Sequence, residues 1–299
     1  STPTVFYGST LYWDGVDGWI LKLKNGTQYK FRDSYLTTNF RQSTPYQIVD
    51  RHGNTVNLIR DGSTGEVTQI VSPNGRRISL TYDSNMRITQ AADDLGRTVT
   101  YTYDANGRLQ SVTDPAGGVE QYTYDSNNAM LTVVDKRNNT MVTNTYDANG
   151  RVATQTYADN TTNSFAYTLD GNGKVTQTDV TDERGAVKRL QFNASGYPLT
   201  ITRALGQPEQ QVTQFAVDSA TNLTSSATDA LGRTTAFQYD ALGSLTQKTL
   251  LSGTPNAVTW TYTYEPTYNQ MASATDPLNH TATFAYDSAG DLVSVTDAL

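Results

Sequence analysis

The stretch TVTYTYDANGRLQSVTDPAGGVEQYTYD, residues 98–125, contains nearly the same phrase twice. Tyr103-Asp104 closes the first copy, and Tyr124-Asp125 closes the second copy 21 residues later. A fixed period of this length is typical of proteins built from stacked structural repeats. The period therefore predicts a repeat architecture and leaves open whether each copy also carries chemistry.

The strand pattern within one copy alternates with a period of two. In TVTYTYD, Val99, Tyr101 and Tyr103 share one face of a strand, because successive side chains point to opposite sides. The following segment GRLQSVTD is less regular, since Leu109 and Val112 lie three apart and share a face only if the strand contains a bulge. The face opposite the tyrosines carries the hydroxyls of Thr98, Thr100 and Thr102.

Two turn signals divide each copy into two strands. A short polar turn containing Gly follows Tyr-Asp, as in YDANGRL, and a second turn that opens on Asp follows about ten residues later, as in DPAGG. Asn-Gly pairs accept positive φ, and an Asp side chain caps the free N–H groups of a turn. Each repeat is therefore predicted to be two strands and two turns.

The period covers most of the chain, with intervals of 21 to 25 residues that weaken over 155–225 and then recover. We predict an N-terminal hairpin and cap region over residues 1–47, which leads into about ten repeats over 48–299. The pairs that define the repeat are Tyr82-Asp83, Tyr103-Asp104, Tyr124-Asp125, Tyr146-Asp147, Tyr239-Asp240 and Tyr286-Asp287.

Composition supports strands throughout. The chain has 19 Tyr against 8 Phe and 3 Trp, and only 17% of its residues are charged, so strand formers outweigh charged helix formers. One two-strand unit cannot bury its tyrosines alone, whereas stacked units form a continuous sheet with tyrosines in ladders. The sequence therefore predicts an all-β array of short antiparallel strands in an elongated or spiralling sheet.

Charge and cysteine content exclude several classes of protein. The net charge is −7 and no Lys/Arg-rich run occurs, so we expect no nucleic-acid partner. No run approaches the roughly 18 apolar residues of a spanning helix, and the start STPTVFYGSTLYWDG lacks the features of a signal peptide. The absence of Cys excludes disulfides and thiol nucleophiles. We expect a soluble segment cut from a longer protein, with no membrane insertion of its own.

The histidines and paired acids are better explained as turn residues than as catalysts. His52 and His280 are the only histidines, and both lie in predicted turns, where a catalytic triad or zinc site would lack convergent partners. Adjacent acids occupy positions of the second turn, and we interpret them as turn caps rather than as a glycosidase pair: Asp93-Asp94 and Asp182-Glu183.

Two segments, WDGVDGW and LDGNGKV, contain the Asp and Gly residues that are typical of calcium loops. After Asp170 and Asn172 the next alternate residue is Lys174, so a hairpin turn is the preferred interpretation. A weak surface ion at Asp14 and Asp17 stays open. Without a convergent nucleophile, base or metal cluster, we predict no enzymatic activity, no cofactor and no metal site.

Aromatic side chains suggest a binding role as the main alternative. Exposed aromatic rings bind sugars by stacking, and Trp13 and Trp19 of the N-terminal hairpin YWDGVDGWILKLKNGTQYKF are the candidate glycan-binding residues. A tyrosine at every repeat is better explained by packing between repeats.

The segments YDANGRL, YTYDANGRLQSVTDPAGG and DALGRTTAFQYDALGSL resemble the YD repeats of the Rhs family. That family includes bacterial polymorphic toxins, the B and C components of insecticidal toxin complexes, and the animal teneurins. The resemblance is strong over residues 82–151 and 229–297 and weak over 155–225. It is partial over 12–80, where YQIVDRHGNTV and SPNGRRISLTYD fit the pattern.

The resemblance implies a long sheet wound into a hollow shell, with the tyrosines in rows. In bacterial members the shell encloses a toxic C-terminal segment that self-cleavage releases, and in teneurins it is part of a surface adhesion receptor. This sequence has no shell-closing core, no paired-Asp cleavage segment and no variable toxin domain. The DPAGG of residues 114–118 echoes the family's cleavage region but occupies an ordinary turn position.

We therefore predict a structural part of a YD-repeat shell in a large secreted or cell-surface protein, which encloses or presents a toxin or effector domain outside this chain. The alternative is a carbohydrate-binding or cell-adhesion module. Open sheet edges predict pairing with further repeats of the same protein or with another copy.

Overall fold

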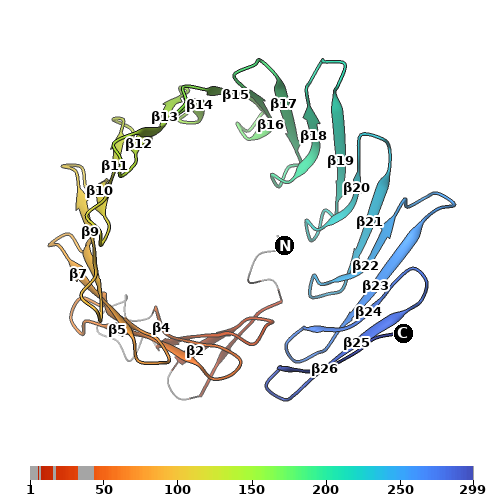
Figure 1. The fold of residues 1–299 in the computed structure, drawn as a ribbon, viewed down its shortest axis with the longest axis horizontal. Helices are drawn as coiled ribbons and strands as arrows, with labels where there is room; N and C mark the ends of the chain where they lie inside the picture. Colours follow the sequence, from red (N-terminus) through yellow and green to blue (C-terminus); the bar gives the residue numbers. More distant parts are fainter. Residues whose placement is uncertain (1–5, 7, 16–17, 33–43, 299) are drawn as a thin grey trace. The chain divides into compact units, whose positions relative to one another are not determined.

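The structure, a computed structural model, describes residues 6, 8–15, 18–32 and 44–298 (Figure 1). These residues form 26 β-strands and no helix, which confirms the prediction of an all-β chain. The strands are short, from four residues in β1 to eight in β15, and their pairings are antiparallel.

The strands follow one another along the chain with a turn or loop between each pair. In order they are β1 (Thr10–Trp13), β2 (Gly18–Lys22), β3 (Gln28–Arg32), β4 (Pro45–Val49), β5 (Thr55–Arg60), β6 (Val67–Val71), β7 (Arg77–Tyr82), β8 (Ile88–Asp93), β9 (Thr98–Tyr103), β10 (Leu109–Thr113), β11 (Val119–Tyr124), β12 (Met130–Val134), β13 (Thr140–Tyr146), β14 (Val152–Tyr157), β15 (Thr162–Leu169), β16 (Val175–Thr181), β17 (Val187–Phe192), β18 (Pro198–Arg203), β19 (Gln211–Val217), β20 (Thr224–Thr228), β21 (Thr234–Tyr239), β22 (Leu245–Leu250), β23 (Val258–Tyr264), β24 (Met271–Thr275), β25 (Thr281–Tyr286) and β26 (Leu292–Thr296).

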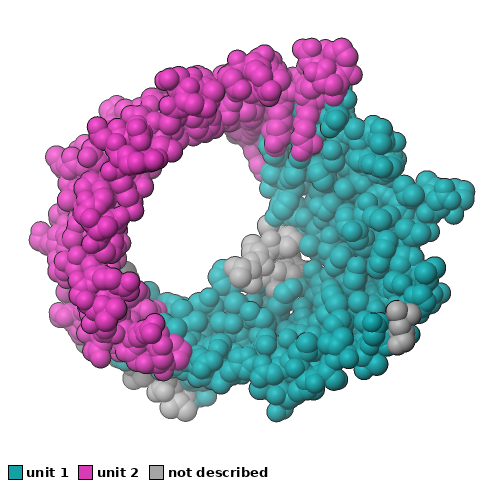
Figure 2. All heavy atoms as spheres, in the orientation of Figure 1, with its two compact units in different colours: residues 1–56, 191–202, 210–299 teal, residues 57–190, 203–209 magenta. Residues whose placement is uncertain are grey.

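The chain divides into two units, which Figure 2 shows in different colours. In the unit of residues 1–56, 191–202 and 210–299, consecutive strands pair from β1 to β4 and from β19 to β26. In the unit of residues 57–190 and 203–209, they pair from β5 to β16. Within each run a strand lies beside its sequence neighbours, as expected from two strands and two turns per repeat.

The turns at the two ends of strand β10 share one geometry. Asp104 N–H donates to the Arg108 carbonyl at 2.9 Å, and Gly107 N–H donates to the Asp104 carbonyl at 2.9 Å. Asp104 Oδ1 accepts the N–H groups of Asn106 and Arg108, each at 2.9 Å. Gly107 has a φ of 82°, which is the left-handed residue of a three-residue hairpin loop.

The second turn of the repeat is built in the same way. Asp114 Oδ1 accepts the N–H groups of Ala116 at 2.8 Å and Gly118 at 2.9 Å, which confirms that DPAGG is a turn. We call the turns at the Tyr-Asp positions YD turns: 61–66, 83–87, 104–108, 125–129, 147–151, 170–174, 193–197, 218–223, 240–244, 265–270 and 287–291. We call the others second turns: 23–27, 50–54, 72–76, 93–97, 114–118, 135–139, 157–161, 182–186, 229–233 and 276–280.

A shift of register interrupts strand pairing next to the YD turns. It falls between Thr81 and Tyr82 in the β7–β8 pair, and between Leu109 and Ser111 in the β9–β10 pair. The second shift is the bulge that the spacing of Leu109 and Val112 requires. Each of these bulges lies beside the tyrosine that precedes the YD turn.

Few apolar side chains of the described residues are withdrawn from solvent. Among the described residues, the buried apolar side chains are Ile20 and Leu23 of the N-terminal hairpin, each 7% exposed. The tyrosines of the Tyr-Asp pairs are half-buried. The described strands are therefore held by backbone ladders and half-buried side-chain contacts rather than by a closed apolar core.

Gly171 and Gly173 test the turn geometry within one YD turn. Gly173 has a φ of 77°, whereas the φ of Gly171 lies outside the left-handed region, and a Cβ at either position meets no atom within 4 Å. Gly173→Ala is expected to lower the free energy of unfolding by about 1 kcal/mol through backbone strain alone. Gly171→Ala is expected to leave it unchanged or to raise it slightly. Urea denaturation measures both, and equal effects would contradict the turn geometry.

Candidate functional site

The tyrosine of the Tyr-Asp pair closes the open end of its own hairpin. Tyr103, the last residue of β9, donates its hydroxyl to the carbonyl of Ile88, the first residue of β8, at 2.7 Å. The other end of this hairpin is the second turn 93–97. The same bond, between 2.5 and 3.0 Å long, is made by eight tyrosines: Tyr82, Tyr103, Tyr124, Tyr146, Tyr167, Tyr239, Tyr264 and Tyr286.

The strand register explains why this carbonyl takes a side-chain donor. The β8–β9 ladder runs from the second turn only as far as the pair of Gln90 with Thr100. Ile88 lies two residues beyond that pair, so its carbonyl receives no N–H from β9 within the ladder. A carbonyl that is shielded from water and has no hydrogen-bond donor lowers the free energy of unfolding by about 1–3 kcal/mol. The hydrogen bond from the Tyr103 hydroxyl removes this cost.

An arginine connects the tyrosine to the preceding repeat. The guanidinium carbon of Arg87, in the YD turn before β8, lies 4.4 Å from the centroid of the Tyr103 ring. A cation over an aromatic face is attracted by the electron density of the ring, by about 0.5–2 kcal/mol. The arginine thus links the YD turn of one repeat to the tyrosine of the next. The same contact recurs with Arg108 over Tyr124 at 4.9 Å and Arg151 over Tyr167 at 5.0 Å.

The aspartate of the pair holds this arginine. Asp83 Oδ2 accepts Nε of Arg87 at 2.8 Å and lies 2.7 Å from its Nη2. The Arg87 side chain is 27% exposed, whereas Arg97 of a second turn, paired with Asp93, is 67% exposed. The arginine of the YD turn is therefore shielded by the ring it covers. We call this set the Asp–Arg–Tyr link: Asp83, Arg87 and Tyr103; Asp104, Arg108 and Tyr124; Asp147, Arg151 and Tyr167.

The link shifts the pKa of its acid and of its phenol in opposite directions. The backbone N–H of Arg108, and then the Arg108 side chain, hold the pKa of Asp104 below its ordinary value. Burial raises the pKa of Tyr103, against the opposing effect of Arg87. At neutral pH the carboxylate is therefore charged and accepts hydrogen bonds, while the phenol keeps its proton and donates one.

The residue that closes the YD turn changes along the chain. Arg87, Arg108 and Arg151 accept the first N–H of their turns through their carbonyls and supply the link. The other YD turns are closed by residues other than arginine. In the last three YD turns the side chain of the closing residue contacts another turn, and these residues are Ser244, Gln270 and Asp291. Sequence reasoning missed these contacts.

A contact between turns joins the first hairpins to the last ones within one unit. Tyr268, in the YD turn 265–270, has its ring between Gly26 of the N-terminal hairpin and Gly290 of the last YD turn. A Cβ on Gly26 would stand 2.7 Å from Cδ1 of the ring, and a Cβ on Gly290 would stand 2.6 Å from Cδ2. We call this contact the turn joint: Gly26, Arg51, His52, Tyr268, Gln270, Gly290 and Asp291.

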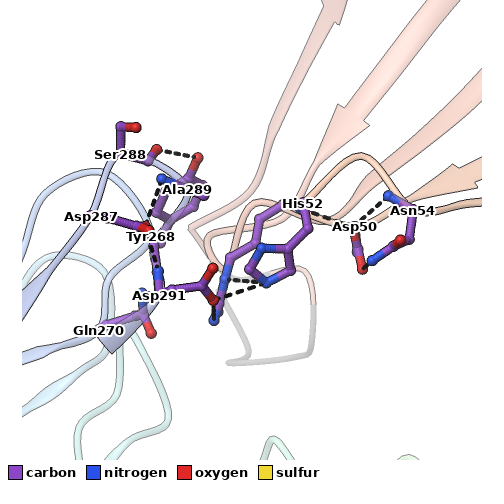
Figure 3. Close-up of polar contacts among 11 residues, drawn as sticks. Asp50, His52, Asn54, Tyr268, Gln270, Asp287, Ser288, Ala289 and Asp291 are labelled. Carbon is purple, nitrogen blue, oxygen red and sulfur yellow. Dashed lines mark hydrogen bonds and ion pairs between the residues drawn. The ribbon is translucent and has the colours of Figure 1, made fainter. Parts of the chain in front are cut away.

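Charged side chains form the second part of the turn joint (Figure 3). His52 Nε2 lies 3.5 Å from Asp291 Oδ1, and Arg51 Nη2 lies 3.8 Å from the same oxygen. Arg51 Nε donates to His52 Nε2 at 3.1 Å. Asp50 Oδ1 accepts the backbone N–H of His52 at 2.9 Å. The cap of this second turn thus orients both side chains toward Asp291.

The two candidate glycan-binding residues face each other across β1 and β2. Trp13 and Trp19 are paired in register, with ring centroids 5.8 Å apart and ring planes at 73°. They are 41% and 47% exposed. Their geometry leaves parts of both rings open to solvent, and their binding role stays a prediction.

The histidines and paired acids lie in turns. His280 Nδ1 lies 3.0 Å from Asp276 Oδ2 within one second turn, whereas His52 belongs to the turn joint, so the two histidines do not occupy equivalent places. Asp93 and Asp182 each accept two backbone N–H groups, as predicted for turn caps.

The candidate ion sites also belong to hairpins. Asp170 Oδ1 accepts the N–H of Lys174 at 2.9 Å, and Asp14 Oδ1 accepts that of Gly18 at 3.1 Å. Asp17 lies outside the described residues. Within the part of the chain that the structure describes, no three His, Asp or Glu side chains are placed to hold a metal ion. In the same residues no helix has the length and apolar character needed to cross a membrane.

Two family models match the segments that contain this geometry. The model described as Teneurin YD-shell matches residues 74–204, which include all three Asp–Arg–Tyr links. The model described as RHS Repeat matches residues 217–255. The chain belongs to the Rhs/YD-repeat family. The resemblance read from the YD repeats is thereby confirmed.

Solved structures with the YD-repeat fold are much larger chains. The crystal structure of TcdB2-TccC3 without its hypervariable C-terminal region aligns with 97% of this chain, at 15% identity and a TM-score of 0.51. The TcdB2-TccC3-Cdc42 crystal structure aligns with 93% at 13% identity and a TM-score of 0.45. This chain covers 18% and 20% of those two chains. A comparison with curated proteins found no match.

The hydroxyl bond of the YD repeat is tested by removing one oxygen. Tyr103→Phe leaves the Ile88 carbonyl without its donor, so we expect the free energy of unfolding to fall by about 1 kcal/mol. Tyr101→Phe is the matched control, because Tyr101 lies on the same strand, pairs with Val112 and is not one of the eight tyrosines. An equal effect of both changes in urea denaturation would argue against the bond.

Acid is expected to weaken the YD-repeat sheet. The pKa values of Asp83, Asp104 and Asp147 are lowered in the folded chain, first of all by backbone N–H groups of their own turns. The stability that such carboxylates contribute is present above their unfolded value near 3.8 and is lost as pH falls through the folded value. Urea midpoints are expected to be lower at about pH 3 than at about pH 7. Replacing all three with Asn should shrink that difference, and an unchanged difference would contradict the prediction.

Proposed function

We propose that this chain is a structural segment of a YD-repeat shell in a large secreted or cell-surface protein. The observation that carries the proposal is the bond from a tyrosine hydroxyl to the carbonyl that opens a hairpin, made by eight tyrosines. The tyrosine that defines the repeat therefore serves the sheet itself. Membership of the Rhs/YD-repeat family supports the same role.

The proposal assigns no catalysis to this segment. The repeated aspartates accept hydrogen bonds in turns, and their hydrogen bonds lower the pKa of groups such as Asp104. A general acid that works near neutral pH needs the opposite shift. The acids of the repeat are therefore suited to capping turns and holding arginines.

We further propose that the shell encloses or presents an effector that lies outside these 299 residues. The structure of TcdB2-TccC3 that shares the fold lacks a hypervariable C-terminal region, which is a property of that protein. A shell of uniform repeats next to a variable segment supports a role in which the shell stays the same while the enclosed effector differs between proteins. The identity of the effector lies beyond this proposal.

Strand β26 is the proposed edge for further repeats. Among the described residues it pairs with β25, and Leu292, Val293 and Val295 are more than half exposed. Leu292 opens β26 as Ile88 opens β8, at the position whose carbonyl accepts a tyrosine hydroxyl. The edge is therefore suited to one more strand of the same repeat, from further repeats of the protein or from another copy.

An extension of the chain tests this edge. Residues 297–299 and 229–231 share the sequence DAL, so a copy of residues 232–240, GRTTAFQYD, added after residue 299 recreates the turn and strand that follow β20. The added tyrosine then follows Leu292 by 15 residues, as Tyr239 follows Thr224. We expect the extended chain to unfold at higher urea, and phenylalanine in place of the added tyrosine to remove about 1 kcal/mol of the gain.

The control for this extension is the same nine residues in scrambled order. A scrambled extension is expected to add no stability, because it contains neither the turn nor the strand pattern. The proposed edge would be contradicted if the native extension stabilised the chain no more than the scrambled one. It would also be contradicted if phenylalanine in place of the added tyrosine left the stability unchanged.

A carbohydrate-binding or adhesion module is the second candidate, because Trp13 and Trp19 form an exposed edge-to-face pair. Aromatic faces open to solvent stack on sugar rings. A glycan array tests this role. Binding that Trp13→Ala and Trp19→Ala abolish, and that Trp260→Ala in β23 preserves, would establish it. An array without binding would exclude the glycans tested and leave the wall as the proposal.

A further inference from the structure

The turn joint differs in kind from the contacts between neighbouring strands. Neighbouring strands share ladders of backbone hydrogen bonds, as in β25 and β26. The turn joint is made by turns and side chains, such as Gln270 Nε2 donating to the Gly290 carbonyl at 2.6 Å and Asp291 beside His52 and Arg51. Ion pairs with exposed partners such as Asp291 are individually weak. The joint is therefore where these hairpins can separate while their strands stay paired.

His52 occupies a position with two alternative partners. Its Nε2 accepts a hydrogen bond from Arg51 Nε at 3.1 Å, which requires that this nitrogen carry no proton. The same nitrogen lies 3.5 Å from Asp291 Oδ1. A proton on Nε2 ends its role as acceptor, places two positive charges side by side, and gives Asp291 a charged donor. Protonation thus exchanges a bond within one turn for an ion pair between two turns.

Charged groups of both signs surround the joint. Although burial acts to raise the pKa of Glu265, the backbone N–H of Gln270 and other donors, together with Arg51, hold it below its ordinary value, so this carboxylate is charged. Carboxylates around the joint outnumber cations by four to two. The charged groups are Asp50 and Arg51 of the turn that carries His52, Lys24 of the packed hairpin, Glu265 of the middle turn, and Asp287 and Asp291 of the last turn.

We propose that the turn joint is a proton-responsive latch, in which protonation of His52 forms an ion pair with Asp291 and holds the first and last hairpins of this unit together more tightly. Histidine is the side chain that ordinarily changes charge between about pH 5 and 8, and this is the range in which the latch is to be tested. The inference concerns movement within one unit and does not depend on the proposed function of the chain.

The ring of Tyr268 makes the latch an all-or-none contact. It fits only because Gly26 and Gly290 lack side chains, since a Cβ at either place would overlap the ring. Gly26→Ala is therefore expected to displace Tyr268 and open the joint at every pH. This variant defines the open state against which the effect of pH is measured.

The distance between two labels tests the latch directly. The chain has no Cys, so Thr55→Cys and Ser288→Cys introduce the only two sites for spin labels. Pulsed electron paramagnetic resonance then reports the distance across the joint. We expect the long-distance fraction to fall about threefold between about pH 8 and pH 5.5, a change of the size that an exposed ion pair produces.

The second histidine provides the matched control, since the chain has only two. His52→Gln is expected to abolish the change with pH, His280→Gln to preserve it, and Asp291→Asn to raise the long-distance fraction at both pH values. Circular dichroism confirms that each variant keeps its sheet. The proposal is overturned if the distances do not depend on pH, if His52→Gln still responds, or if Gly26→Ala leaves the distances unchanged.

Discussion

The bond from a tyrosine hydroxyl to the first carbonyl of its own hairpin is the constraint on which the described sheet depends. Bulges interrupt strand pairing next to the YD turns, and the ladder of a hairpin such as β8–β9 stops short of the first carbonyl of that hairpin, that of Ile88. Tyr103 satisfies this carbonyl, and its ring in turn receives Arg87 from the preceding repeat. Asp83 fixes that arginine. One tyrosine thus closes a hairpin and attaches it to its neighbour, which explains why the Tyr-Asp pair recurs.

Local parts of this arrangement could be predicted from the sequence, because turns and strand alternation depend on residues close together in the chain. The second turn at DPAGG and the bulge near Leu109 follow from local chemistry. The contact of Arg87 with Tyr103 could not be predicted, since the register across two hairpins decides it. The turn joint was also missed, because Gly26 and Tyr268 are joined by tertiary packing that no local pattern encodes.

YD turns that are closed by different residues make different contacts. Where arginine closes a YD turn, the turn strengthens the wall through the Asp–Arg–Tyr link. Where Gln270 or Asp291 closes it, the turn contacts another turn instead. The closing position thus links neighbouring repeats in some YD turns and joins distant hairpins in others. Contacts between turns can open without disturbing strand pairing.

A double-mutant cycle between Arg87 and Tyr103 tests most directly whether the link joins successive repeats. Arg87→Met removes the cation, Tyr103→Leu removes the ring, and urea denaturation of the single and double variants gives their coupling energy. A favourable coupling of about 0.5–1 kcal/mol is expected, and no coupling is expected in a parallel cycle between Tyr103 and the more exposed Arg97. Additive effects of Arg87 and Tyr103 would show that the repeats are held together in another way.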